Sequence, residues 1–157
     1  MLELDYNIAR QIGYEDLLRT AVEIGATTSL NQLMLQMLFN YLFVNQDDHM
    51  RNFSFMCGED FRYRATPAYD ITYANGKAQT VEHQLKLYGK SLSKIVLDDV
   101  VELANEFSIE INFVAGAIEK MMTLREQKLP ELLRLHNVSN KKQKEVLDSV
   151  MLRKFGE

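Results

Sequence analysis

Several features that are common in other protein classes are scarce in this chain of 157 residues. Its one cysteine, Cys57, cannot form an intrachain disulfide and fits a reducing compartment. There are only two prolines, and repeats and low-complexity tracts are missing, so nothing marks a linker between domains. A chain of this length is also short for two hydrophobic cores. We therefore expect a single domain over residues 1–157.

An excess of positive charge is also missing, since 18 Lys and Arg stand against 22 Asp and Glu. The net charge is −4, whereas direct nucleic-acid binding needs a basic surface that displaces counterions, so we expect no direct nucleic-acid partner. No basic stretch followed by an apolar one opens the sequence, which argues against a secretory signal. Together with the single cysteine, this predicts a cytoplasmic location.

Residues 24–46 contain no Asp, Glu, Lys or Arg, and this run predicts a buried helix over residues 30–44 with Ser29 as its N-terminal cap. Within it, Gln32, Gln36 and Asn40 form a narrow polar stripe at a spacing of four. A helix that is apolar nearly all round is buried in a core. The alternative, a membrane span, requires about twenty largely apolar residues, and the Thr, Ser, Asn and Gln content disfavours it.

The remaining pattern predicts a mainly α fold (α+β, like the C-terminal lobe of a kinase), a helical bundle with a small β-hairpin. Residues 53–57 and 61–65 alternate at period two around a three-residue turn at 58–60. Alternation in residues 81–87 suggests another strand, which ends at Gly89.

Helices are expected elsewhere, and residues 1–13, which have no clear period, are expected to form a loosely placed arm. Pro130 either kinks a helix or opens the next one. The predicted helices cover residues 14–22, residues 99–107 with Asp98 as cap, residues 113–122 with an extension to 128, and a last helix capped by Ser139.

The loop after the uncharged helix has the residue types that phosphoryl transfer requires. Asp47 is followed five positions later by Asn52, and Asp70 comes after the hairpin. In protein kinases an Asp with this spacing accepts the proton of the substrate hydroxyl, while the Asn and a later Asp hold Mg²⁺. Asp48 competes with Asp47 for the role of base, but Asp47 has the five-residue spacing. On spacing alone, a solvated loop remains an alternative.

Residues 45–52, named the acid–amide loop from here on, closely resemble the signature of the HipA family of bacterial Ser/Thr kinases, the toxins of persistence-type toxin–antitoxin modules. The family pattern is Asn-x-Asp-(Asp/Ala/Gly)-His-x-Lys-Asn-Phe-Ser, then a hairpin, then Leu-Ala-Pro-x-Tyr-Asp. Residues 14–18 and 87–90 also resemble the family, so the likeness covers residues 14–125. The two matching segments read Asn45-Gln46-Asp47-Asp48-His49-Met50-Arg51-Asn52-Phe53-Ser54 and Ala65-Thr66-Pro67-Ala68-Tyr69-Asp70.

This resemblance implies a Ser/Thr protein kinase that uses ATP and Mg²⁺. It makes Asp47 the catalytic base and Asn52 and Asp70 the Mg²⁺ ligands at the nucleotide. It gives His49 the task of bracing the loop by hydrogen bonding, with a surface-exposed His as the alternative. Arg51 stands where the family has Lys; both are cations near the transferred phosphate, but the guanidinium is a planar fork and the ammonium a point charge.

The resemblance also implies partners. It suggests a protein substrate, with an aminoacyl-tRNA synthetase as one candidate, and a helix-turn-helix antitoxin. No membrane partner is expected.

The parts that grip ATP are missing from the sequence. No Gly-x-Gly-x-x-Gly occurs among the seven glycines, nor does a strand Lys followed by a helix Glu. Residues 89–91 read like the tail of a P-loop, but position 84 is Gln where that motif needs Gly. We therefore expect a kinase C-terminal lobe without its N-terminal lobe. Such a chain is a fragment, a split kinase completed by a separately encoded lobe, or a degenerate product with a binding role.

Two other functions compete with this one. The first is a non-catalytic toxin–antitoxin interaction module that binds a helix-turn-helix partner. The second is a metal-dependent hydrolase built from Asp47, Asp48, His49 and Asp70. A zinc site is disfavoured, because His83 and His136 have no partner at metal-ligand spacing and the chain has one cysteine.

Overall fold

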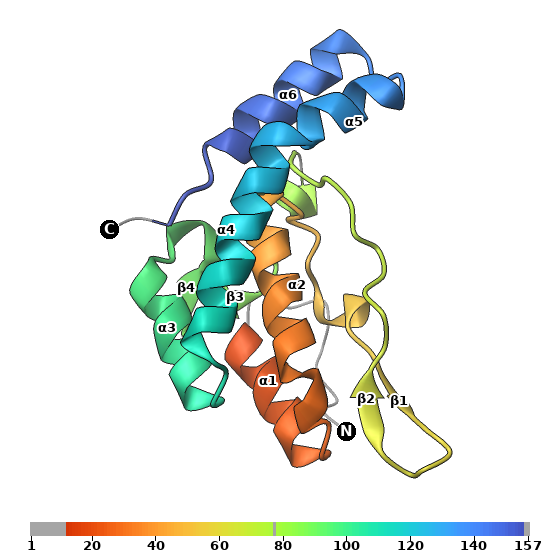
Figure 1. Cartoon of the computed structure of the whole chain (residues 1–157), viewed down its shortest axis with the longest axis vertical. Helices are drawn as coiled ribbons and strands as arrows, with labels where there is room; N and C mark the ends of the chain where they lie inside the picture. Colours follow the sequence, from red (N-terminus) through yellow and green to blue (C-terminus); the bar gives the residue numbers. More distant parts are fainter. Residues whose placement is uncertain (1–11, 77, 156–157) are drawn as a thin grey trace.

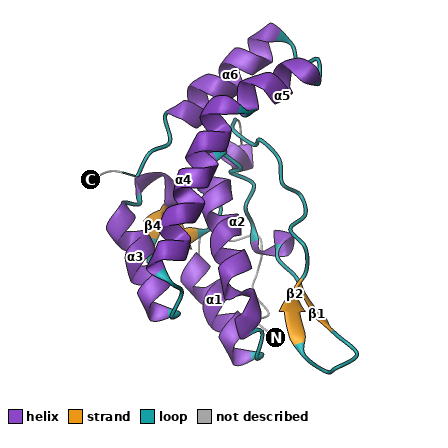
Figure 2. Cartoon of the chain, in the orientation of Figure 1, coloured by secondary structure: helices purple, strands orange, loops and turns teal. Residues whose placement is uncertain are grey.

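The computed structural model describes residues 12–76 and 78–155, which form six α-helices and two small antiparallel hairpins (Figures 1 and 2). The predicted mainly α fold with a small β-hairpin is confirmed. The loosely placed arm was predicted for residues 1–13, and residues 1–11 of it lie outside the described residues.

The uncharged helix α2 (Leu30–Leu42) forms the centre of the core, as its sequence predicts. It packs between α1 (Tyr14–Glu23) and α4 (Ile111–Gln127), and α3 (Leu97–Glu106) packs against α4 (Figure 1). The side chains of Met34, Met37 and Leu38 are fully buried in this core. Burial of an apolar side chain stabilises a fold by about 1.5–3 kcal/mol, so the broad apolar face of α2 is the main reason that the helices assemble here.

Two further helices pack together beyond one end of α2 and α4. They are α5 (Leu129–Leu135) and α6 (Asn140–Met151), at the top of Figure 1. Pro130 lies in the first turn of α5 and therefore opens that helix. The predicted cap at Ser139 is confirmed, since its hydroxyl accepts a hydrogen bond from Lys142 N at 3.4 Å.

The predicted hairpin after the acid–amide loop is present. Strand β1 (Phe55–Cys57) pairs antiparallel with β2 (Tyr63–Ala65), with Phe55 opposite Ala65. The connection covers residues 58–62 and is longer than the predicted turn at 58–60. The carboxylate of Asp60 accepts from Arg62 N at 3.2 Å and from Arg64, so an acid–base clamp shapes the longer loop.

The strand predicted over residues 81–87 is mostly wrong. Only β3 (Lys86–Leu87) is a strand, and it pairs with β4 (Lys90–Ser91) across a tight turn. A 3₁₀ turn (Ala78–Val81) comes before it, and the side chain of Val81 is 62% exposed. The alternation failed because residues 83–85 are all buried in succession, two of them polar and bound to a buried acid described below.

Two predicted helix caps are also wrong. A 3₁₀ turn (Thr27–Ser29) leads into α2, and the Ser29 hydroxyl accepts from Ala65 N at 2.8 Å instead of capping the helix. Helix α3 begins at Leu97, before the predicted cap Asp98. There Asp99 accepts from Val96 N at 3.0 Å, so the acid one position later closes the first turn.

Candidate functional site

The direction of the acid–amide loop is set by the way α2 ends. Asn45 N donates to Asn40 O at 2.9 Å. This bond ends a helix when the residue directly before the donor has a left-handed backbone. That residue is Val44, with φ of +59°. The chain therefore turns sharply at Val44 and delivers residues 45–52 from a rigid, buried element.

The polar stripe of α2 supports this loop and the hairpin behind it. Gln36 donates to the carbonyl oxygen of Asn52 at 3.4 Å, and Gln32 donates to that of Thr66 at 2.6 Å. Asn40 is buried and donates to the hydroxyl of Tyr14 at 3.0 Å. The amides that interrupt the apolar face of α2 thus each bind a group of the site or of its support.

Asp48 is a structural residue in this arrangement. Its side chain is 0% exposed, and its carboxylate binds the Tyr14 hydroxyl at 2.8 Å, Gln84 N at 2.7 Å and Nδ1 of His83 at 2.9 Å. A buried carboxylate needs such partners, because an unpaired one is costly to desolvate. Burial and the neighbouring Asp48 carboxylate raise the pKa of Tyr14 well above its ordinary value, so Tyr14 stays a donor.

Asp47 points the other way. Its side chain is 37% exposed, and its carbonyl oxygen accepts from Nδ2 of Asn52 at 2.8 Å. This bond spans the five-residue spacing noted in the sequence and uses the amide nitrogen of Asn52. The Oδ1 atom of that amide is then the one suited to a cation, since metals such as Mg²⁺ take oxygen ligands.

His49 lies beside Asp47 without a close hydrogen bond to it. Its Nε2 is 3.9 Å from Oδ1 of Asp47, too far for a hydrogen bond. Its Nδ1 is buried and has no hydrogen-bond partner among residues 12–76 and 78–155. The structure therefore shows no bracing bond from this side chain in the part of the chain described.

The segment that contains Asp70 runs beside the acid–amide loop, as the hairpin between them predicts. Asn45 Nδ2 lies 3.4 Å from the carbonyl oxygen of Asp70. The hydroxyl of Tyr69 donates to the backbone carbonyl oxygen of Arg51. Further along, Gln46 N donates to Ala74 O at 2.9 Å. The side chain of Asp70 is exposed, and its φ is +53°, a conformation that Asp tolerates better than most residues. Residues 65–76 can be followed along this side of α2 in Figure 1.

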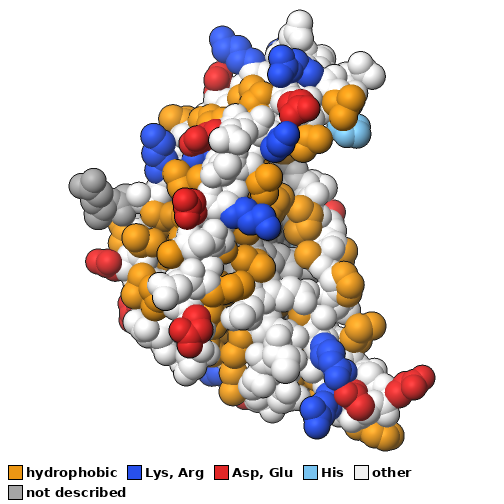
Figure 3. Space-filling model, viewed as in Figure 1, with side chains coloured by type: hydrophobic (Ala, Val, Ile, Leu, Met, Phe, Trp, Pro, Cys, Tyr) orange, Lys and Arg blue, Asp and Glu red, His pale blue; other side chains and the backbone are white. Residues whose placement is uncertain are grey.

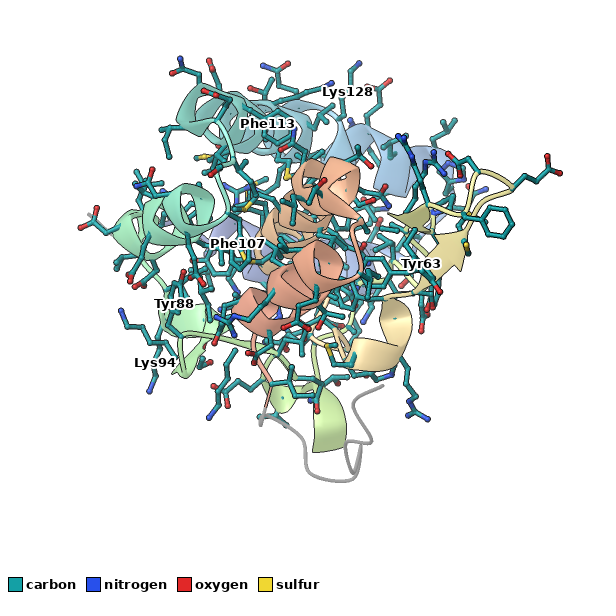
Figure 4. The ribbon with its side chains drawn as sticks, turned by 90° about the horizontal axis from the view of Figure 1, so that it is seen from below. Tyr63, Tyr88, Lys94, Phe107, Phe113 and Lys128 are labelled. Atoms are coloured by element: carbon teal, nitrogen blue, oxygen red, sulfur yellow. The ribbon has the colours of Figure 1, made fainter. Side chains whose placement is uncertain are left out.

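Sequence reasoning missed part of the support. Tyr14, Asn40 and His83 belong to one buried network with Asp48, although His83 was considered only as a metal ligand. The hydrogen-bonded groups come from α1, α2, the acid–amide loop and the segment before β3. Figure 4 shows α1 and α2 between the β1–β2 hairpin, marked by Tyr63, and the β3–β4 turn, marked by Tyr88. The signal in the sequence was the pair of adjacent acids, Asp47 and Asp48, directly after the uncharged run.

The described residues contain no group of three or more His, Cys, Asp and Glu side chains placed to hold a metal ion. Among the helices of residues 12–76 and 78–155, none combines the length and the apolar character needed to cross a membrane. On the face shown in Figure 3, acidic and basic side chains are interspersed, so that face carries no continuous basic surface.

A comparison with protein families decides the relationship. Residues 1–129 match the model of the HipA-like C-terminal domain, which is well over half of the chain. The chain belongs to this family. The resemblance noted in the acid–amide loop is thereby confirmed. The HipA-like match ends at the start of α5, so α6 lies beyond it. A search of curated proteins found no match.

Proposed function

We propose that this chain is the catalytic lobe of a HipA-like Ser/Thr protein kinase, which transfers the γ-phosphoryl group of ATP to a protein. The observation that carries the proposal is the split between two adjacent acids. Asp48 is buried and fully engaged, whereas Asp47 is presented to solvent and tied to Asn52 at the kinase spacing. A solvated loop has no need of such a support, and a base must reach its substrate.

The proposed metal ligands come from the two segments that hydrogen bonds hold together. Asn52 offers its amide oxygen and Asp70 an exposed carboxylate, oxygen donors of the kind that Mg²⁺ takes. Mg²⁺ held there would neutralise charge on the phosphates of ATP. Arg51, on the surface of the same loop, would add a positive charge near the transferred group. The resemblance makes His49 a brace of this loop, although its buried Nδ1 has no hydrogen-bond partner among the described residues.

In this reaction the oxygen of a Ser or Thr hydroxyl forms a bond to the γ-phosphorus of ATP. The bond from that phosphorus to the β,γ-bridging oxygen breaks, and ADP leaves. Asp47 accepts the proton of the attacking hydroxyl. Asp48 takes no direct part, because it has no exposed surface.

The proposed kinase needs an N-terminal lobe that covers the nucleotide, because no Gly-x-Gly-x-x-Gly occurs in residues 1–157. The competing proposal is a non-catalytic module that binds a helix-turn-helix partner. The retained Asp47, Asn52 and Asp70 favour the kinase, since an interaction module has no physical need to present them.

The test mixes this chain with the N-terminal lobe of a HipA-like kinase, Mg²⁺ and ATP labelled at the γ-phosphorus. We expect labelled phosphate to be incorporated into protein, and Asp47→Asn to lower the rate by about 10²–10⁴-fold because the base is lost. Asp148→Asn, an exposed acid on α6, is the matched control and leaves the rate unchanged. Incorporation that Asp47→Asn does not affect would refute the assignment. Failure of ATP–Mg²⁺ to bind in the presence of the lobe would favour the interaction module.

A further inference from the structure

Four helices of this protein end with a left-handed residue followed by a backbone bond to the last turn. In α1 and α5 the left-handed residues are of types that tolerate this conformation, Gly25 and Asn137, and in α3 the residue is Ser108, which is not branched at Cβ. In α2 the residue is Val44, whose branched side chain clashes with the backbone at positive φ. Such a residue persists where the surrounding structure holds it, and it often marks a functional site.

The side chain of Val44 explains why valine stands there. It is fully buried, away from the main core, in a second apolar cluster with Val146 and Val150 of α6. Glycine would suit the backbone better but would leave this cluster without one of its three buried members. The turn that aims the acid–amide loop is therefore held by packing against α6.

Polar contacts connect α6 and the residues after it to the same two segments of the site. With its amide oriented to satisfy both ends, Gln46 accepts from Nη2 of Arg153 at 3.0 Å and donates to Thr80 O at 2.7 Å. Gln46 is the residue directly before Asp47. The hydroxyl of Tyr73, three residues after Asp70, hydrogen bonds to Oγ of Ser149 at 2.7 Å.

The Tyr73 ring also packs in the Val44 cluster, and Nζ of Lys142 lies 4.8 Å from its centroid. A cation at that distance from a ring face is attracted to it. One helix thus contacts both the segment that carries Asp47 and the segment that carries Asp70, through an apolar cluster flanked by hydrogen bonds (Figure 1).

We propose that α6 is the positioning element of the site. It holds Val44 in its left-handed turn and Tyr73 beside it, and so fixes the distance between Asp47 and Asp70. Residues beyond the family match would then set the geometry of residues within it. The consequence for catalysis rests on the proposed kinase function, but the coupling between α6 and the two segments does not.

The experiment measures amide hydrogen exchange in the chain alone, without ATP or a second lobe. The variant Val146→Ala/Val150→Ala keeps the helix, since Ala favours it, and removes the side chains that cover Val44. We expect exchange at Gln46 N and Ala74 N, which donate to Ala74 O and Val44 O, to rise by about tenfold or more. Exchange at Leu38 in the middle of α2 stays at the wild-type rate.

A second variant and a control complete the test. Arg153→Ala removes one side chain without touching the apolar cluster, and we expect faster exchange at Gln46 with Ala74 less affected. Asp148→Ala on the exposed side of α6 changes neither amide. Wild-type exchange at Gln46 and Ala74 in the double variant would overturn the proposal. An equal rise at Leu38 would also overturn it, because α6 would then support the whole fold and not the site. Neither result depends on whether the kinase assignment holds.

Discussion

At the scale of single residues, the site separates two acids that are adjacent in the sequence. Asp48 is held by three partners from two places in the chain, Tyr14 and residues 83–84, and Asp47 is left partly exposed to solvent. Because the side chain of Asp48 is fixed in the interior, it anchors the backbone from which Asp47 extends. The buried acid is thus the support of the exposed one.

Another acid, Asp99, gives a pH-dependent contribution to stability. Burial opposes ionisation of this carboxyl, but hydrogen bonds from Lys90 and from Val96 N hold its pKa below the ordinary value. A lowered pKa in the folded state stabilises the protein above about pH 4, where the unfolded chain also ionises, and this stabilisation is lost as the pH falls through the folded pKa.

We therefore expect Asp99→Asn to lower the free energy of unfolding at neutral pH, and the difference from wild type to shrink on acidification below about pH 4. Urea unfolding of both proteins across the acid range measures it. The control is Asp98→Asn, the exposed neighbour, whose difference from wild type stays small at every pH. A difference for Asp99→Asn that grows on acidification would contradict the assignment.

At the scale of elements, Ser29 does not act where its sequence position suggests. A serine directly before an apolar run is the usual sign of a helix cap, but its hydroxyl binds Ala65 N of the hairpin. It thus joins the start of α2 to the strand that follows the acid–amide loop.

This gives an element-specific prediction. Ser29→Ala should leave the helix content unchanged and should speed amide hydrogen exchange at Ala65 by about tenfold, the loss of one buried hydrogen bond of about 1–1.5 kcal/mol. Circular dichroism and hydrogen exchange measure the two effects. Thr28→Ala, an exposed neighbour, serves as the control. A fall in helix content with unchanged hydrogen exchange at Ala65 would show that Ser29 caps α2 and does not support the hairpin.

The helix α2, the hairpin and the pair of His83 with Asp48 show what could be predicted from the sequence and what could not. The uncharged helix and the hairpin were predictable, because their signals are local periods of 3.6 and 2. The pairing of His83 with Asp48 spans 35 positions and leaves no local trace. The alternation at residues 81–87 was misleading for the same reason: His83 and Gln84 are buried by a distant acid and not by a sheet.

At the scale of the whole molecule, a buried arginine ties α4 to the C-terminal helix. Arg125 is fully buried, and its Nη1 donates to Val150 O at 3.2 Å and to Arg153 O at 2.6 Å. Burial lowers its pKa from the ordinary value. A cation at the carbonyl end of a helix also interacts favourably with the helix dipole. Tyr41 of α2 donates to Lys154 O at 2.7 Å nearby, so three helices meet there.

Arg125→Ala would leave both carbonyl groups without this donor, and we expect the free energy of unfolding to fall by about 3 kcal/mol, as for hydrogen bonds to a charged group. Denaturant unfolding measures it. Arg134→Ala provides a matched control, because that side chain is exposed and binds only a carbonyl of its own helix, Pro130 O at 3.3 Å. Equal stability of the two variants would show that the buried arginine does not tie these helices together.

The polar stripe of α2 supports the site through hydrogen bonds that depend little on salt concentration or pH. Gln32, Gln36 and Asn40 bind the surrounding groups with neutral amides, which have no charge for dissolved salt to screen and no proton to lose over the range in which the protein is folded. The exposed carboxylates of Asp47 and Asp70 are screened by salt. Changes of ionic strength will therefore change how strongly these acids attract a cation, while the amide hydrogen bonds of α2 are not screened.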